Sequence, residues 1–339
     1  MEIEKNIKKN SLILMIITLI ILVILLKDHF LEIINSLKDM NFLFLLLAIL
    51  FYFLYVTLKA YVVYKTVNDK SKLSLKEAIK HNIIAQFFNG ITPFSTGGQP
   101  MEIYMLTKHN ISAPIATGIT IQNFIFYQTA LVLSGVLAIL SNCIFKIFPD
   151  IKFLKYFVLL GFLSNTVVAV ALYIIMLSEK MTKTISNFII KLLHKIRIIK
   201  DLDKATNYWE HKLKEFHSNS KVLLKRKKLF FLGILINLIS ITCLYIVPLF
   251  IIKGLTPTNI GIITTLTASA YIAILSAFVP APGATGGIEY GFYKFFGKYI
   301  NTVTLNTTLI VWRFITYYLG VILGGLIFSF EKKGEQKCE

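Results

Sequence analysis

The stretch Ile91-Thr-Pro-Phe-Ser-Thr-Gly-Gly-Gln-Pro100-Met-Glu102 interrupts apolar sequence with two prolines and two glycines. Its core, Pro93-Phe-Ser-Thr-Gly97-Gly98, returns 189 positions later as Pro282-Gly-Ala-Thr-Gly286-Gly287. Both copies read Pro-x-x-Thr-Gly-Gly, and an acid follows each of them, Glu102 or Glu289. Irregular backbone in a very apolar chain is tolerated only where protein buries it or where it lines a watery cavity. Two matching breaks therefore predict a substrate site near the middle of a membrane, between two halves of the chain.

The composition agrees with a membrane location. Hydrophobic residues make up 55% of the 339 residues, and the mean hydropathy is +0.68. Several apolar runs reach the roughly 20 residues that a helix needs to cross the hydrocarbon core. The formal charge of +18 comes from Lys and Arg between these runs, which is typical of membrane topology and of contact with anionic lipids, not of nucleic-acid binding. We expect an all-α, polytopic integral membrane protein.

Motifs for chemistry are absent from the sequence. The three cysteines and six histidines show no metal-ligand spacing. No glycine-rich phosphate loop followed by Lys-Ser or Lys-Thr is present, and no Ser/His/Asp or Cys/His arrangement suggests hydrolysis. We therefore expect no metal, no cofactor and no catalytic residue.

Basic segments set the expected orientation of the first half. Residues 178–228 hold 14 Lys and Arg against 5 Asp and Glu, and Phe42–Tyr64 leads into another lysine-rich loop, so both loops are expected in the cytoplasm. Ala113–Leu140 and Phe153–Leu177 form one out-and-back pair between them. Asn82–Leu106 must then return to the side it left, as a re-entrant hairpin. A short first span, Leu12–Leu26, precedes these elements and is expected to be retained.

Counting membrane crossings in the second half gives the same order of elements with inverted orientation. Phe230–Ile252 runs outward and Leu305–Phe330 runs inward, so Asn259–Lys298 must enter and leave from outside. The segment around Tyr127 also matches the segment around Tyr317, at an offset of 190. We expect inverted repeats of span, re-entrant hairpin and span, with about 6 full spans plus 2 broken hairpins and both termini in the cytoplasm.

The chain is expected to form a single membrane domain, 1–339. A first half at 11–177 contains the repeat at 42–140, and a second, inverted repeat occupies 229–330 before a cytoplasmic tail at 331–339. Between the halves, 178–228 is a basic cytoplasmic linker with amphipathic patterning at Leu202, Ala205, Trp209, Leu213 and Phe216. We expect the linker to lie on anionic inner-leaflet lipids, with a regulatory or partner helix as the alternative.

Charged and hydroxyl side chains at the breaks make a candidate substrate site. A half-helix starting after each Gly-Gly pair would direct its amides toward a phosphate, and intramembrane charge normally faces a cavity or a partner. Arg313 can bind phosphate bidentately or pair with Glu289, whereas Lys59 is expected to snorkel to the cytoplasmic surface. The candidate substrate-binding residues are Pro93, Ser95, Thr96, Gly97, Gly98, Glu102, Asn123, Pro282, Gly283, Thr285, Gly286, Gly287, Glu289 and Arg313.

Further polar residues in apolar segments either line a path or hydrogen-bond between helices. They are Gln86, Asn89, Gln99, Gln122, Asn123, Tyr127, Tyr317 and Tyr318.

The two break sequences, the first with Tyr104 and Leu106 and the second running from Val279 to Glu289, resemble the paired signatures of the flippase-like domain family. That domain is also the membrane part of bacterial lysylphosphatidylglycerol synthases, and the resemblance covers essentially the whole chain. It implies lipid translocation. In bifunctional relatives a soluble domain attaches lysine to phosphatidylglycerol, and the membrane domain moves the product outward, which gives resistance to cationic peptides.

Two details qualify the resemblance. The chain ends at Glu339, soon after the last expected span, so we expect a stand-alone member without the soluble aminoacyl-transferase domain. Where many relatives have Gly-Gly after the second proline of the motif, this chain has Gly283-Ala284, a change that should leave the fold unaltered.

The expected function is that of a flippase for an anionic or aminoacylated phospholipid or a lipid-linked sugar. One alternative is the membrane component of a phosphatidylglycerol lysyltransferase, working with a separately encoded soluble aminoacyl-transferase. Another is a non-transporting membrane scaffold that docks partners through the basic linker. The sequence names neither the lipid nor the energy source, leaves proton coupling through Glu102 and Glu289 open, and allows an oligomer.

Overall fold

The computed structural model describes residues 30–67, 73–148, 152–195, 201–276 and 279–335. Within these ranges every regular element is a helix, which confirms the all-α expectation. Five stretches are long and apolar enough to cross a membrane: Phe42–Val67, Ala113–Phe145, Tyr156–Leu177, Lys227–Leu255 and Thr302–Phe330. The first expected span, Leu12–Leu26, lies outside the described residues.

The first half consists of spans around one broken helix pair. A short α2 (Phe30–Lys38) precedes α3 (Phe42–Val67), and the pair is made of α4 (Leu75–Ile91), the single turn η1 (Pro93–Ser95) and α5 (Gly98–Thr107). Two long helices follow, α6 (Ala113–Phe145) and α7 (Lys152–Leu177). A capping box starts α4, because the Ser74 hydroxyl accepts the Glu77 amide while the Glu77 carboxylate accepts the Ser74 amide. Hydrogen bonding to Ser74 holds the pKa of Glu77 below its usual value.

A two-helix linker leads to the second half, which repeats this order. The linker helices are α8 (Glu179–Lys195) and α9 (Leu202–Lys225). The second half begins with α10 (Lys227–Tyr245) and α11 (Val247–Leu255), and its broken pair is α12 (Ile262–Ser276), the turn η2 (Pro282–Ala284) and α13 (Gly287–Phe296). The last span is α14 (Thr302–Arg313), a π-helical turn η3 (Phe314–Tyr318) and α15 (Leu319–Glu335).

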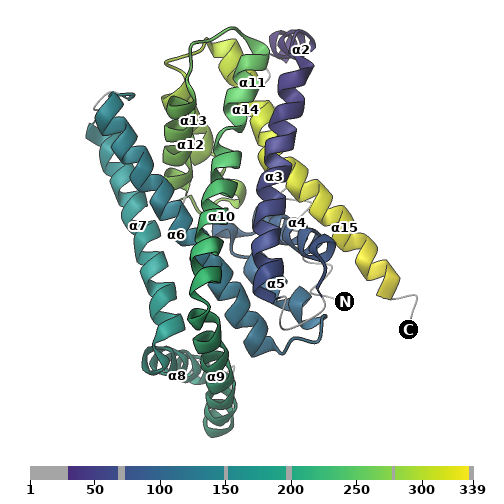
Figure 1. The fold of residues 1–339 in the computed structure, drawn as a ribbon, viewed down its shortest axis with the longest axis vertical. Coiled ribbons are helices and arrows are strands. Elements are labelled where there is room, and N and C mark those ends of the chain that lie inside the picture. Colours follow the sequence, from purple (N-terminus) through teal and green to yellow (C-terminus); the bar gives the residue numbers. More distant parts are fainter. Residues whose placement is uncertain (1–29, 68–72, 149–151, 196–200, 277–278, 336–339) are drawn as a thin grey trace.

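The two broken pairs occupy opposite ends of the bundle. Figure 1 shows α4 and α5 in the lower half and α12 and α13 in the upper half, while α3, α6, α7 and α10 run past both. Helices α4 and α5 pack against each other, as do α12 and α13, and the turns η1 and η2 are in contact. The tips of the two pairs therefore meet inside the bundle.

The outer faces of the long helices are apolar and exposed. Large hydrophobic side chains on α3, α6 and α7 point away from the bundle, among them Leu43, Leu50, Leu137, Leu140, Leu160 and Val167. In a soluble protein such a surface would drive association, whereas lipid tails cover it at no cost. The structure and the composition therefore agree on a multi-pass membrane protein.

Candidate functional site

The two turns between the half-helices begin with the same local structure and diverge at the threonine. In each turn the two residues after the proline are left-handed, with φ of 53° at both Phe94 and Ser95 and φ of 60° and 50° at Gly283 and Ala284. Oγ1 of Thr96 donates to the Pro93 carbonyl at 3.0 Å, and Oγ1 of Thr285 donates to the Pro282 carbonyl at 2.9 Å. The repeated motif therefore gives matching φ values after the proline and matching threonine hydrogen bonds, whereas ψ is −11° at Thr96 and 139° at Thr285.

The glycine pairs start the second half-helices, as the sequence predicted, since α5 begins at Gly98 and α13 at Gly287. Their leading amides already have protein acceptors. The Gly97 amide donates to Oγ1 of Thr92 at 2.8 Å, and the Gly98 amide donates to Oδ1 of Asn89 at 2.7 Å. In the second half the Gly286 amide donates to Oε2 of Glu289 at 2.6 Å. Three of the amides that the sequence predicted to bind a phosphate are therefore already hydrogen-bonded to side chains of the protein.

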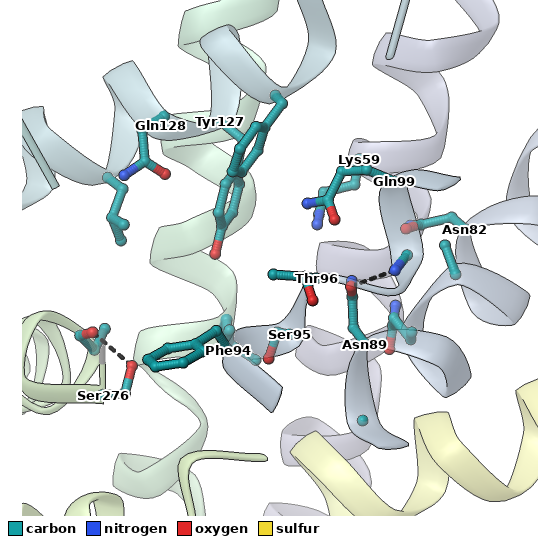
Figure 2. Close-up of a pocket in the computed structure, with 18 of the residues that line it drawn as sticks. Lys59, Asn82, Asn89, Phe94, Ser95, Thr96, Gln99, Tyr127, Gln128 and Ser276 are labelled. Atoms are coloured by element: carbon teal, nitrogen blue, oxygen red, sulfur yellow. Dashed lines mark hydrogen bonds between the residues drawn. The ribbon is translucent and has the colours of Figure 1, made fainter. Parts of the chain in front are cut away.

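A cavity of about 680 Å³ lies where the two tips meet. Its wall includes Ser95 and Thr96 from the first tip, Ala281 and Gly283 from the second, and polar side chains of α3, α4 and α6. Figure 2 shows Phe94, Ser95 and Thr96 at its centre, with Tyr127 and Gln128 on one side and Asn82 and Asn89 on the other. The volume falls in the range of small-molecule sites, about 300–1,000 Å³.

Among the described residues, two charged ones line this cavity, Lys59 from α3 and Glu102 from α5. The Lys59 amine lies 4.5 Å from the centre of the Tyr127 ring and 5.4 Å from that of Tyr55. The sequence favoured a snorkelling Lys59, but the structure places it on the cavity wall, because the two ring faces attract its charge. Oε1 of Glu102 is buried without a hydrogen-bond partner among the described residues.

The wall also carries buried polar atoms without a protein partner in the described chain. They belong to Gln86 (Nε2), Thr120 (Oγ1) and Asn123 (Nδ2), while the Thr66 hydroxyl donates to Oδ1 of Asn123 at 3.1 Å. Buried polar groups are normally satisfied by protein or by water. These atoms therefore indicate a wall that is suited to a hydrated or polar occupant.

Arg313 and Glu289 form a separate buried pair next to the second tip. Nε and Nη2 of Arg313 lie 2.7 Å and 2.5 Å from Oε1 of Glu289, and Nη1 donates to the Gly283 carbonyl at 2.9 Å. The guanidinium also lies 5.4 Å from the centre of the Tyr317 ring. Of the two sequence alternatives for Arg313, the pair with Glu289 is the one present in the structure.

The structure divides the candidate residues between the cavity wall and its support. Six of them line the cavity: Ser95, Thr96, Gly98, Glu102, Asn123 and Gly283. The others build the turns or the buried pair beside it: Pro93, Gly97, Pro282, Thr285, Gly286, Gly287, Glu289 and Arg313. Of the additional polar residues, the wall includes Gln86, Asn89, Gln99, Asn123, Tyr127 and Tyr317.

Sequence reasoning missed several wall residues on neighbouring helices. Asn82 on α4 donates to the Val56 carbonyl at 2.8 Å, and Gln128 on α6 donates to Oδ1 of Asn165 on α7 at 2.8 Å. Tyr55, Asn237 and Ser276 also reach the cavity. A polar residue in an apolar run was the available signal, but it does not tell a cavity wall from a helix contact.

Comparison with known proteins supplies a family for this architecture. Residues 11–324 match the family described as the lysylphosphatidylglycerol synthase TM region. A UPF0104 membrane protein of Archaeoglobus fulgidus is 22% identical over 263 residues, which cover 75% of this chain and 76% of that relative. The family match includes both helix breaks and every helix that lines the cavity. The chain therefore belongs to the family of the lysylphosphatidylglycerol synthase transmembrane region.

Proposed function

We propose that the protein is a lipid translocase of the cytoplasmic membrane, which moves the polar head of a phospholipid between leaflets. The observation that carries the proposal is the polar cavity at the meeting point of two inverted helix breaks, inside a bundle whose outer surface is apolar. A head group needs a polar route through the hydrocarbon core, whereas the acyl tails are already soluble there. A cavity of head-group size within such a bundle supplies that route.

The inverted order of the halves supports a two-sided path. If the basic linker 178–228 lies in the cytoplasm, α4 and α5 enter from the cytoplasmic side and α12 and α13 from the outside, with both termini inside. One pair then borders the cavity toward each leaflet, as in transporters built from inverted repeats. Small movements of one pair against the other would open the cavity to one side at a time.

The wall chemistry fits an anionic or zwitterionic head better than a neutral one. Lys59 offers a cation and Glu102 an anion, and amides, hydroxyls and tyrosines surround them. An aminoacylated phosphatidylglycerol, which carries both a phosphate and an amino group, suits this pair of charges. Lipid-linked sugars carry phosphate as well and form the other substrate class.

Translocation in proteoliposomes tests the proposal. Fluorescent phosphatidylglycerol and lysyl-phosphatidylglycerol are incorporated, and a membrane-impermeant reductant reports the lipid that reaches the outer leaflet. We expect protein-containing vesicles to move at least one of the two lipids faster than empty vesicles do. Equal rates in both kinds of vesicle would contradict the proposal, and formation of lysyl-phosphatidylglycerol by the purified chain would instead favour the synthase alternative.

A matched pair of variants ties movement to the cavity. Ser276 lines the wall and its hydroxyl donates to the Ala273 carbonyl at 2.7 Å, while the exposed Ser329 on α15 makes a similar bond to the Gly325 carbonyl at 2.8 Å. The indole of Ser276→Trp would enter the cavity, whereas that of Ser329→Trp would point into lipid. We expect the first variant to slow movement and the second to match the parent.

A further inference from the structure

Arg313 is buried and Lys59 is partly buried, and these two cations have different electrostatic surroundings. Arg313 is held by the Glu289 carboxylate and by the Gly283 carbonyl. Lys59 has no carboxylate within 4.0 Å among the described residues, and its amine lies over the rings of Tyr55 and Tyr127. An ammonium has three donors and is costly to leave uncompensated in a membrane. Lys59 is therefore the cation of the cavity that still has binding capacity.

The tyrosine faces position this amine without neutralising it. Tyr55 and Tyr127 come from α3 and α6, and both line the same cavity as Lys59. A cation over a ring keeps its full positive charge and its hydrogen-bond donors. The rings therefore hold the amine inside the bundle, against the snorkelling that its position on α3 would otherwise favour.

The surroundings of Lys59 suit an anion with several oxygen atoms. Gln99 lines the same cavity as Lys59 (Figure 2), and its side-chain amide can donate hydrogen bonds. Glu102 also lines the cavity and interacts electrostatically with Lys59. Because its carboxylate repels an anion, the anion is favoured only on the side of the cavity where Lys59 lies. A phosphate next to Lys59 leaves the Glu102 side for a neutral or cationic part of the same ligand.

We propose that Lys59 is the phosphate-binding residue of the cavity, and that its ligand is the phosphodiester of a phospholipid head group. The identification of the ligand as a phospholipid rests on the proposed function, whereas the identification of Lys59 as an anion site does not. It moves the phosphate site away from Arg313 and from the amides of Gly97, Gly98 and Gly286, which already have protein partners. The new site is a residue that the sequence motifs do not mark. Tyr55 and Tyr127 act as positioning residues for the amine.

The chain provides a close control for Lys59. Lys65 lies on the same helix and also contacts two tyrosine rings, with its amine 5.4 Å from the centre of Tyr61 and 5.6 Å from that of Tyr64. It does not line the cavity. Lys65→Gln therefore removes the same charge and the same kind of ring contact from α3, but outside the proposed site.

Binding of short-chain, water-soluble phosphatidylglycerol to the purified full chain in detergent tests the proposal. We expect Lys59→Gln to weaken binding about tenfold or more, as for loss of a hydrogen bond to a charged group, Lys59→Arg to retain part of it, and Lys65→Gln to match the parent. Thermal unfolding of each variant serves as the check that its fold is retained. Equal binding by the parent and both Lys59 variants would overturn the proposal.

Two further experiments distinguish a lipid phosphate from free phosphate as the ligand, and the Lys59 site from the translocase proposal. Inorganic phosphate is tested as a competitor; if it binds as tightly as the lipid and needs Lys59 equally, the lipid assignment is wrong. The Lys59 variants are then assayed in proteoliposomes. Lipid movement that is unaffected by Lys59→Gln would overturn the Lys59 site while the translocase proposal stands. Lysine-dependent binding without movement in the parent would support the site and contradict the translocase.

Discussion

Nε of Arg313 on α14 lies 2.7 Å from Oε1 of Glu289 on α13, so one ion pair joins the last span to the half-helix after the second break. The other carboxylate oxygen of Glu289 accepts the Gly286 amide, and the guanidinium donates to the Gly283 carbonyl. The pair therefore fixes the backbone of the motif at two points, the Gly283 carbonyl and the Gly286 amide. A contact that holds two parts of a turn is first of all a structural element.

Removing one member of this pair should destabilise the protein. Glu289→Gln leaves the guanidinium, whose side chain is only 6% exposed, without its counter-ion, and breaking a buried pair costs about 3–5 kcal/mol. Thermal unfolding in detergent should show a clear drop in Tm. As a control, Lys183→Gln breaks the ion pair between Lys183 and Glu210, whose side chains are 50% and 34% exposed, respectively. This variant should change Tm little. A Glu289→Gln variant as stable as this control would show that the pair does not hold the turn.

The second turn predicts a graded response to added methyl groups. At Gly283, with φ of 60°, a Cβ would lie 2.4 Å from Cε2 of Tyr317, whereas at Gly286, with φ of 92°, nothing lies within 4 Å. Gly283→Ala therefore adds a steric clash to the strain of a left-handed residue, which is roughly 1–2 kcal/mol, while Gly286→Ala adds strain alone.

The clash at Gly283 should extend to the first half of the protein. Tyr317 also donates its hydroxyl to the Gly90 carbonyl at the end of α4, at 2.8 Å. We expect Gly283→Ala to lower both Tm and lipid movement more than Gly286→Ala does. The reverse order would show that strain, not the contact with Tyr317, determines the tolerance of this turn.

The sequence predicted the elements well, because their signals are local. The observed α6 begins at Ala113, where the apolar run begins, and both half-helices begin inside the Gly-Gly pairs. Helix breaking by proline and glycine, and the length of an apolar run, depend only on neighbouring residues. The same motif therefore gave the same start of a turn twice, with matching φ values in the two residues after the proline and matching threonine hydrogen bonds.

The distribution of charge within the site was beyond sequence reasoning. Lys59, Glu102, Glu289 and Arg313 are each a single charge in an apolar setting, and the sequence does not tell which pair together. That outcome depends on where α13 and α14 bring their side chains in space, and on tyrosines 4 and 68 positions away from Lys59 that form its surroundings. Pairing took Arg313 out of the cavity wall, while the rings kept Lys59 within it.

Close packing between α4 and α15 gives a further prediction. A Cβ at Gly324 would lie 2.3 Å from the Ile83 carbonyl oxygen, which is backbone and can move only with its helix. Gly324→Ala should therefore push α15 away from α4 and lower Tm. Gly261→Ala adds the same methyl group where nothing lies within 4 Å, and it should leave Tm unchanged. Equal Tm values for the two variants would show that α4 and α15 are not closely packed in the protein.

The linker helix α8 presents an apolar face that nothing in the described chain covers. Its exposed hydrophobic side chains follow helical spacing, and lysines flank them; the hydrophobic ones are Met181, Ile185, Phe188, Ile189 and Leu192, with exposed fractions from 41% to 67%. Figure 1 shows α8 at the lower end of the bundle, with its axis at a large angle to that of α7. A basic amphipathic helix in this place suits the surface of an anionic membrane.

Depth-dependent fluorescence quenching would test this membrane contact of α8. The native cysteines are first replaced by serine, and a single cysteine at Phe188 or at Ser186 carries a fluorophore. Phe188 is 67% exposed on the apolar face, whereas the partly buried Ser186 lies on the opposite side of the helix. Since interfacial helices bury their apolar face about 5–10 Å into the lipid, brominated lipids should quench the label at Phe188 and spare the label at Ser186. Equal quenching at both positions would show that α8 does not lie on the bilayer by this face.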